Sequence, residues 1–146
     1  MKPVIQQEIS GCGFASVAAL AGIGYRDVKR VANAMGIHAG DRRLWSETGH
    51  VRTLLEHFGI DSAPGETPFG SWEALPEAAL LSIKWHREGG RPFWHWVVFW
   101  RGPEGSVVLD PKKSLKTHVR TDFGRMHPKW YIPVRPVARD TGGIPG

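Results

Sequence analysis

The chain has 146 residues, 41% of them hydrophobic and 23% charged, with a net charge of +5. This length predicts one domain over residues 1–137 and a flexible glycine-rich tail over residues 138–146. The composition excludes a disordered chain and a membrane bundle, and a single cysteine excludes an intrachain disulfide. Basic residues are scattered and no ligand spacing suits a metal, so we expect no nucleic acid partner, cofactor or metal. Without an apolar leader or a transmembrane span, a cytoplasmic location is expected, with no membrane insertion.

The N-terminal half has the apolar spacing of helices. Small apolar residues follow Cys12, and in two further segments apolar residues recur every three or four positions before a glycine. These patterns predict helices over residues 12–20, 25–35 and 46–58, the last with its first turn at Ser46. Residues 61–71 contain two prolines and two glycines and predict a loop.

The C-terminal half instead predicts strands. They are expected over residues 79–85, 93–100, 106–110 and 129–134. The second and third strands flank a Gly-Pro-Glu-Gly turn and should form a hairpin. Pro133 lacks a backbone N–H, which predicts an edge position for the last strand. Helices followed by antiparallel strands indicate an α+β domain with N-terminal helices packed on a C-terminal sheet.

Cys12 lies between two glycines at the predicted start of the first helix. Backbone N–H groups and the helix dipole stabilise a thiolate at such a position, and the thiolate is the nucleophilic form of cysteine. A small buried core residue is the commoner fate of a lone cysteine. Cys12 is therefore a nucleophile candidate only if a base lies beside it.

His95 is the natural candidate for that base, because it is the one polar residue in the strongest predicted strand. A buried imidazole needs a partner. Asp110 ends the next predicted strand, so hairpin pairing can bring its carboxylate to the second ring nitrogen. Taken separately, His95 also suits a core histidine and Asp110 a turn residue before proline.

Gln6 lies six residues before Cys12 and supplies a side-chain amide. Such an amide can donate to an oxyanion together with the Cys12 backbone N–H. Gln7 is adjacent, so the pattern leaves open which of the two glutamines faces the site. An exposed polar residue near the terminus is the alternative for either.

In this order the residues resemble papain-like cysteine peptidases, and more narrowly the bacteriocin-processing peptidases that cleave after a double glycine. The matching segments read QQEISGCGFAS, HWVV and VLDP, at residues 6–16, 95–98 and 108–111. The resemblance implies a papain-like fold, with Cys12 as nucleophile, His95 as general base and acid, Asp110 as orienting residue and Gln6 as oxyanion donor. Gly11 departs from the family, which commonly has an acidic residue there.

The same resemblance implies a peptide substrate with small residues before the cut, such as a Gly-Gly leader, and a separate ABC exporter as a possible partner. The expected substrate contacts are Gly13, Trp94 and Trp96. For the two tryptophans, packing between sheet and helices is the simpler interpretation. The pair Gly142–Gly143 in the predicted tail also makes self-trimming a formal possibility.

Two other functions fit the same residues. Amidases and acyltransferases also use Cys, His and Asp in this chain order, with a different acyl acceptor. A catalytically inert papain-like module that binds a peptide is the second alternative. The presence of all four residues favours the peptidase over the inert module.

Overall fold

The structure, a computed structural model, describes residues 1–135, so the predicted tail over residues 138–146 lies outside the described residues. The helices α1(Cys12–Ala21) and α2(Tyr25–Ala34) confirm the first two predicted helices. Helix α1 is buried from Gly13 to Leu20, which explains its small apolar composition, and Gly22 closes it in the left-handed region at φ 73°. Among the described residues, no helix is both long enough and apolar enough to cross a bilayer.

The third helix begins later than predicted. Residues Arg42–Ser46 form a short 3₁₀ turn, η1, and α3 covers Gly49–His57 with Thr48 as its N-cap. The predicted first turn at Ser46 is therefore wrong. The buried residues of α3 begin at Val51, whereas the buried Trp45 belongs to the preceding 3₁₀ turn. The apolar residues of this region therefore belong to two separate elements.

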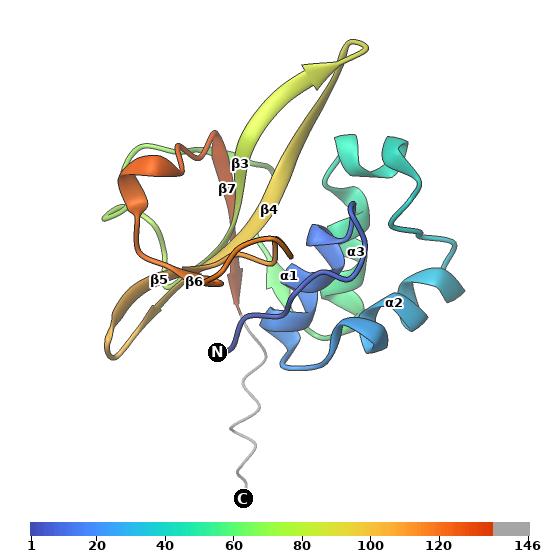
Figure 1. Ribbon diagram of the computed structural model, residues 1–146, viewed down its shortest axis with the longest axis horizontal. Helices are drawn as coiled ribbons and strands as arrows, with labels where there is room; N and C mark the ends of the chain where they lie inside the picture. The colour runs from blue at the N-terminus through green and yellow to red at the C-terminus, as the bar shows by residue number, and fades with distance from the viewer. Residues whose placement is uncertain (136–146) are drawn as a thin grey trace, which may run out of the picture.

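The strands form one antiparallel sheet in the described part of the chain. Their bounds are β1(Asp61–Ser62), β2(Thr67–Pro68), β3(Ala78–Glu88), β4(Arg91–Gly102), β5(Gly105–Leu109), β6(Val119–Arg120) and β7(Trp130–Arg135). The order across the sheet is β1-β7-β3-β4-β5-β6, with β2 also paired to β7. The helices lie on one side of this sheet, and the long β3–β4 hairpin extends beyond it (Figure 1). The predicted α+β class is confirmed.

Strand β7 is not an edge strand, which corrects the prediction made from its proline. The predicted loop over residues 61–71 contains β1 and β2, and both pair with β7 on the side away from β3. The Pro133 carbonyl accepts from Ala63, a residue that belongs to neither short strand. The N–H and C=O of one residue point to the same side of a strand, so the N–H that Pro133 lacks would have pointed away from β3. The hydrogen bonds between β7 and β3 are therefore not interrupted by the proline.

Both faces of the sheet are covered. On the helix side, Phe14, Leu54 and Trp96 are among the residues of the main core. On the other side, Val97, Phe99 and Val108 form a smaller cluster with Trp72 and Phe123 packed against it. Strand β4 therefore alternates between two apolar environments, which explains why its sequence reads as a nearly continuous hydrophobic run.

Candidate active site

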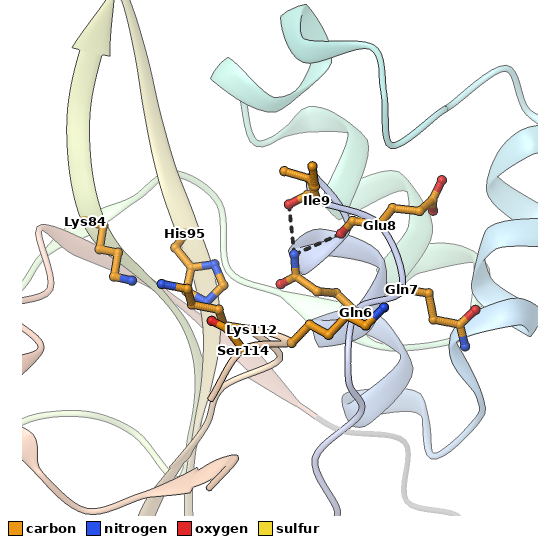
Figure 2. A pocket seen from close by; sticks show the side chains of 9 residues that line it. Gln6, Gln7, Glu8, Ile9, Lys84, His95, Lys112 and Ser114 are labelled. Carbon is orange, nitrogen blue, oxygen red and sulfur yellow. Dashed lines mark hydrogen bonds between the residues drawn. The ribbon is translucent and has the colours of Figure 1, made fainter. Parts of the chain in front are cut away.

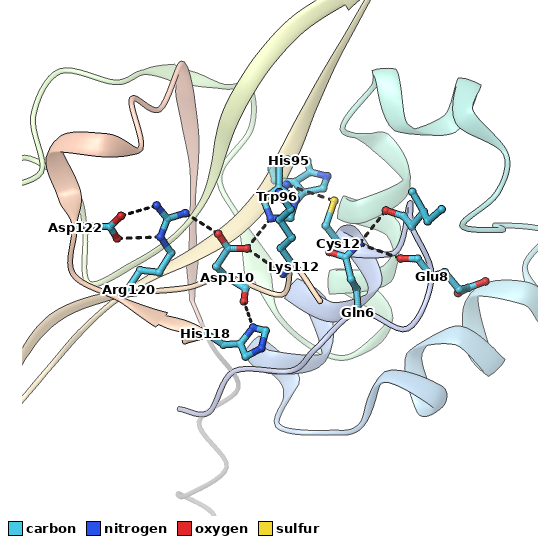
Figure 3. A network of polar contacts seen from close by, with 11 residues as sticks. Gln6, Glu8, Cys12, His95, Trp96, Asp110, Lys112, His118, Arg120 and Asp122 are labelled. Atoms are coloured by element: carbon cyan, nitrogen blue, oxygen red, sulfur yellow. Dashed lines mark hydrogen bonds and ion pairs between the residues drawn. The ribbon is translucent and has the colours of Figure 1, made fainter. Parts of the chain in front are cut away.

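Cys12 is the first residue of α1, at the junction between the helices and the sheet (Figure 3). No side chain caps this helix end, where the N-cap residue is Gly11. The thiol is partly exposed, and its Sγ accepts a hydrogen bond from the backbone N–H of Trp96 at 3.4 Å. The sulfur therefore lies at the positive end of the helix dipole and in contact with a backbone donor.

Gly11 has a structural reason to lack a side chain. A Cβ at this position would lie 2.2 Å from the Tyr25 hydroxyl oxygen. That hydroxyl donates to Glu8 at 2.5 Å and fixes the turn leading into α1. Burial and the contact with Glu8 raise the pKa of Tyr25, so the hydroxyl keeps its proton. An acidic side chain at position 11, as the resemblance leads one to expect, would therefore clash with Tyr25 in this packing.

The edge of β4 is open where Cys12 approaches it. The ladder between β4 and β5 ends at the pair Val98–Leu109, two residues short of Trp96. The Trp96 N–H is therefore available to sulfur rather than to a neighbouring strand. The length of β5 thus decides where the thiol can sit.

His95 and Asp110 form a hydrogen-bonded pair. The His95 Nε2 lies 2.7 Å from Asp110 Oδ1, and the two side chains are 13% and 1% exposed. Burial lowers the pKa of His95, but the hydrogen bond with Asp110 and the nearby Cys12 sulfur outweigh burial and raise it to about 9. With Nε2 held by the carboxylate, Nδ1 is the ring nitrogen left for Cys12.

Three donors hold the Asp110 carboxylate. Besides His95, the Lys112 backbone N–H donates to Oδ1 at 3.0 Å and the Arg120 guanidinium donates to Oδ2 at 2.9 Å. Burial raises the pKa of Asp110, but these partners, His95 first, outweigh burial and lower it to about 2. The carboxylate therefore stays ionised and holds the imidazole in one orientation.

Gln6 and Gln7 both line the cleft beside His95, but they differ in burial. Gln6 is 7% exposed and its backbone N–H donates to the Pro111 carbonyl at 3.0 Å, whereas Gln7 is exposed. Its Nε2 donates to the carbonyls of Glu8 and Ile9 at 2.9 and 2.8 Å, while Oε1 is buried without a partner among the described residues. Donation to an oxyanion therefore requires Gln6 to release one of these carbonyls.

The three expected substrate contacts differ in position. Trp96 is 1% exposed and packs edge-on with Trp94 and Trp130, with ring centroids 5.5 Å away in both pairs, so these tryptophans do pack between sheet and helices. Trp94 and Trp96 nevertheless also line a cleft beside Cys12. Gly13 lines neither of the clefts beside His95, and a Cβ there would lie 2.9 Å from Trp45. Gly13 is thus a packing residue that lets α1 approach β4.

Two clefts meet at His95. One, of about 230 Å³, is lined by Cys12 and by aromatic side chains that include Trp45, Phe93 and Trp94. The other, of about 450 Å³, is lined by Gln6 and by the lysines Lys84, Lys112 and Lys113 (Figure 2). We name them the aromatic cleft and the basic cleft. Ile9, Lys84 and His95 line both, and Cys12 lines only the aromatic one.

The sequence did not point to Arg120 or to the Lys112 and Trp96 backbone donors. Arg120 lies in the two-residue strand β6, which pairs with β5 and so brings the guanidinium beside Asp110. Asp122 holds the same guanidinium with bonds of 2.9 and 2.7 Å. A strand this short has no periodicity, and the only available signal is a basic residue ten positions after Asp110.

No protein-family model and no curated relative matches the sequence. Chains of solved structures match the fold, and the following two are among them. A double-glycine motif protease from an AMS/PCAT transporter, in complex with the leader peptide, has a TM-score of 0.60 and 18% identity, over 94% of this chain and 93% of that chain. The peptidase domain of Streptococcus ComA, a bifunctional ABC transporter of a quorum-sensing pathway, has a TM-score of 0.52 and 15% identity, over 93% and 98%. The predicted resemblance is thereby confirmed at the level of the fold.

Proposed function

We propose that this chain is a cysteine peptidase that cleaves after small residues, such as the Gly-Gly of a leader peptide. The observation that carries the proposal is the meeting of Cys12, at the start of α1, with the buried His95–Asp110 pair of the sheet. A free thiol at a helix N-terminus beside an oriented imidazole is the arrangement that nucleophilic catalysis requires.

In the proposed reaction, His95 holds the proton of Cys12, and the thiolate sulfur bonds to the scissile carbonyl carbon. The carbonyl oxygen becomes an oxyanion, which the Cys12 backbone N–H and a released Gln6 amide stabilise. As the C–N bond breaks, His95 gives its proton to the leaving amine. Water, deprotonated by His95, then attacks the thioester and frees the acid and Cys12.

The narrow aromatic cleft suits an extended segment without side chains, because its walls are rigid rings. We therefore place the residues before the cut there, with Trp94 as a wall. A leader peptide as substrate and a separate ABC exporter as partner are consistent with the names of the two structural neighbours. A thiol nucleophile must be reduced, which suits the cytoplasm.

The test is the pH dependence of Cys12 alkylation by iodoacetamide in the wild type and in His95→Ala. We expect labelling well below about pH 8 in the wild type and its loss in the variant, because His95 stabilises the thiolate. Slow labelling of both proteins would make Cys12 a structural residue and would overturn the proposal.

A second measurement separates the reaction types. Double-glycine leader peptides are incubated with the enzyme in the presence and absence of an amine, and the products are identified by mass spectrometry. A peptidase yields the free acid under both conditions, whereas an acyltransferase yields the amide when the amine is present. An alkylation-competent protein that releases neither product would be a binding module. The mass of the protein itself after long incubation tests self-trimming after Gly143.

A further inference from the structure

Lys84 and Lys112 place two positive charges beside His95. Lys84 lies on β3 and Lys112 follows Asp110 by two residues, and their side-chain ends approach one another next to the His95 ring (Figure 2). Contact with Lys112 and burial lower the pKa of Lys84, as expected for two ammonium groups held together. Lys113 adds a third charge to the same cleft.

Among residues 1–135, no carboxylate forms a salt bridge with these three lysines. Asp110, the nearest buried acid, is already held by His95, by Arg120 and by the Lys112 backbone N–H. Glu8 lies on the opposite wall, but its carboxylate binds Tyr25 and, at 3.3 Å, Lys29. Asp110 attracts Lys84 through space but makes no salt bridge with it. Like charges placed together without a salt-bridge partner are unfavourable, so this arrangement favours an anionic ligand.

The backbone at Lys84 is also unusual. Its φ is 55°, in the left-handed region, and the pairing of β3 with β4 shifts register between Ile83 and His86. A lysine gains nothing from this conformation in itself, because the region favours glycine. The irregularity directs Lys84 into the cleft instead of along the regular strand, and strain of this kind is concentrated at functional sites.

The proposed reaction indicates which half of the substrate the basic cleft receives. The acyl half of the substrate stays bonded to Cys12, so it occupies the aromatic cleft, which Cys12 lines. The leaving amine takes its proton from His95 and departs on the other side. The basic cleft is lined by His95 and Gln6 but not by Cys12, so it receives the residues after the cut.

We propose that Lys84 and Lys112 form a subsite for a carboxylate carried by the first residues after the cut. The inference rests on the proposed function and adds a charge preference on the leaving side. The carboxylate can belong to an acidic side chain or to a nearby free C-terminus, since both present two oxygens to ammonium donors.

Three peptides that share a Gly-Gly leader segment separate these sources. The first has Glu after the cut and a C-terminal amide, the second has Gln and an amide, and the third has Gln and a free carboxylate two residues beyond the cut. We expect kcat/KM for the Glu peptide to exceed that for the Gln amide by about tenfold, the range of a charge-assisted hydrogen bond. A similar gain for the third peptide would show that a C-terminal carboxylate also binds.

The variants Lys84→Gln and Lys112→Gln, alone and combined, test the residues. Each removes one positive charge and retains the backbone, including the Lys112 N–H that holds Asp110. The Glu-over-Gln ratio should fall towards one in the double variant. Lys116→Gln is the matched control, because it makes the same charge change on a lysine that lines neither cleft at His95, and it should retain the ratio. Equal kcat/KM for all three peptides in the wild type would overturn the inference.

Alkylation gives a readout that does not need turnover. The rate of Cys12 labelling by anionic iodoacetate, divided by that by neutral iodoacetamide, reports the local attraction for a carboxylate. We expect the ratio to fall severalfold in the double lysine variant and to stay constant in Lys116→Gln. If no peptide is cleaved, the proposed function fails and this ratio alone decides: an unchanged ratio overturns the carboxylate subsite as well.

Discussion

The aromatic cleft and the basic cleft meet at His95 but have different chemistry. The aromatic cleft is the smaller, about 230 against 450 Å³, and its rings are held by packing against the core. The basic cleft presents lysines that no carboxylate neutralises in residues 1–135. Rigid rings select by shape, whereas ammonium groups select by charge. Lys84 lines both clefts, whereas Trp94 lines only the aromatic cleft and Lys112 only the basic one. Recognition before and after the cut should therefore be separable by mutation of Trp94 and Lys112.

Ile9 stands between the two clefts and is 98% exposed. An isoleucine this exposed contributes nothing to the core, and at this position it lies beside any chain that crosses from one cleft to the other. The carbonyl of Ile9 also holds the Gln6 amide. Ile9, which lies between the clefts, is thus hydrogen-bonded to Gln6, the residue proposed to stabilise the oxyanion.

The largest effect is expected at the proposed nucleophile, Cys12, which lines the aromatic cleft beside His95. Cys12→Ala should lower kcat by at least about 10⁴-fold, because no other group can form the thioester. Thermal unfolding should stay close to that of the wild type, since the thiol is only partly buried. The measurement is cleavage of a Gly-Gly peptide followed by chromatography. Turnover close to the wild-type rate would place the nucleophile elsewhere.

Asp110→Asn should follow, with kcat/KM lower by about 100- to 10⁴-fold, because an amide no longer fixes the charged, correctly oriented His95. Asp122→Asn is the matched control: its carboxylate binds the same Arg120 but does not touch His95. We expect the control to lose no more than about fivefold. Equal losses in the two variants would mean that Asp110 acts only through Arg120.

Trp94→Ala should alter selectivity in the aromatic cleft alone. Removing this wall should raise kcat/KM for Ala-Ala relative to Gly-Gly before the cut by about tenfold, because space opens for a side chain. The Glu-over-Gln preference after the cut should not change. Trp85→Ala, on the β3–β4 hairpin outside both clefts, is the control. If the two variants behave alike, Trp94 serves only the core.

The smallest effect concerns stability. The pKa of His95 is raised from 6.5 to about 9 in the folded chain, so folding favours its proton. This contribution is complete below about pH 6.5 and is lost as the pH rises through about 9. Urea unfolding of wild type and His95→Gln at pH 6 and pH 10 should show a wild-type advantage that is larger at pH 6, by up to about 3 kcal/mol. The same difference at both values would contradict the charged pair.

Much of the fold was predictable, and the errors share a cause. The first two helices and the β4–β5 hairpin were found because their hydrophobic periods are long enough to be unambiguous. The interior position of β7 was missed because its neighbours β1 and β2 are two residues each. Pairing of such short strands depends on segments far apart in the chain, and local patterns do not contain it.

The candidate site divides in the same way. Cys12, His95 and Asp110 are predicted as site residues from the chemistry of single residues in chain order, and the structure places His95 beside Asp110 and in one cleft with Cys12. The sequence does not distinguish Gln6 from Gln7, whereas the structure shows that Gln6 is buried and Gln7 exposed, with both lining the basic cleft. Arg120 was missed because its contact with Asp110 depends on the β5–β6 pairing.

The sequence by itself determined the α+β class, the cysteine at a helix start and the imidazole in an apolar strand. These properties depend on periodicity and residue chemistry, which neighbours along the chain carry. Only the tertiary structure decided that β5 stops short of Trp96, that Arg120 reaches Asp110 and that two lysines face one another beside His95. These features come from strand ends, register and a bulge, which long-range packing sets.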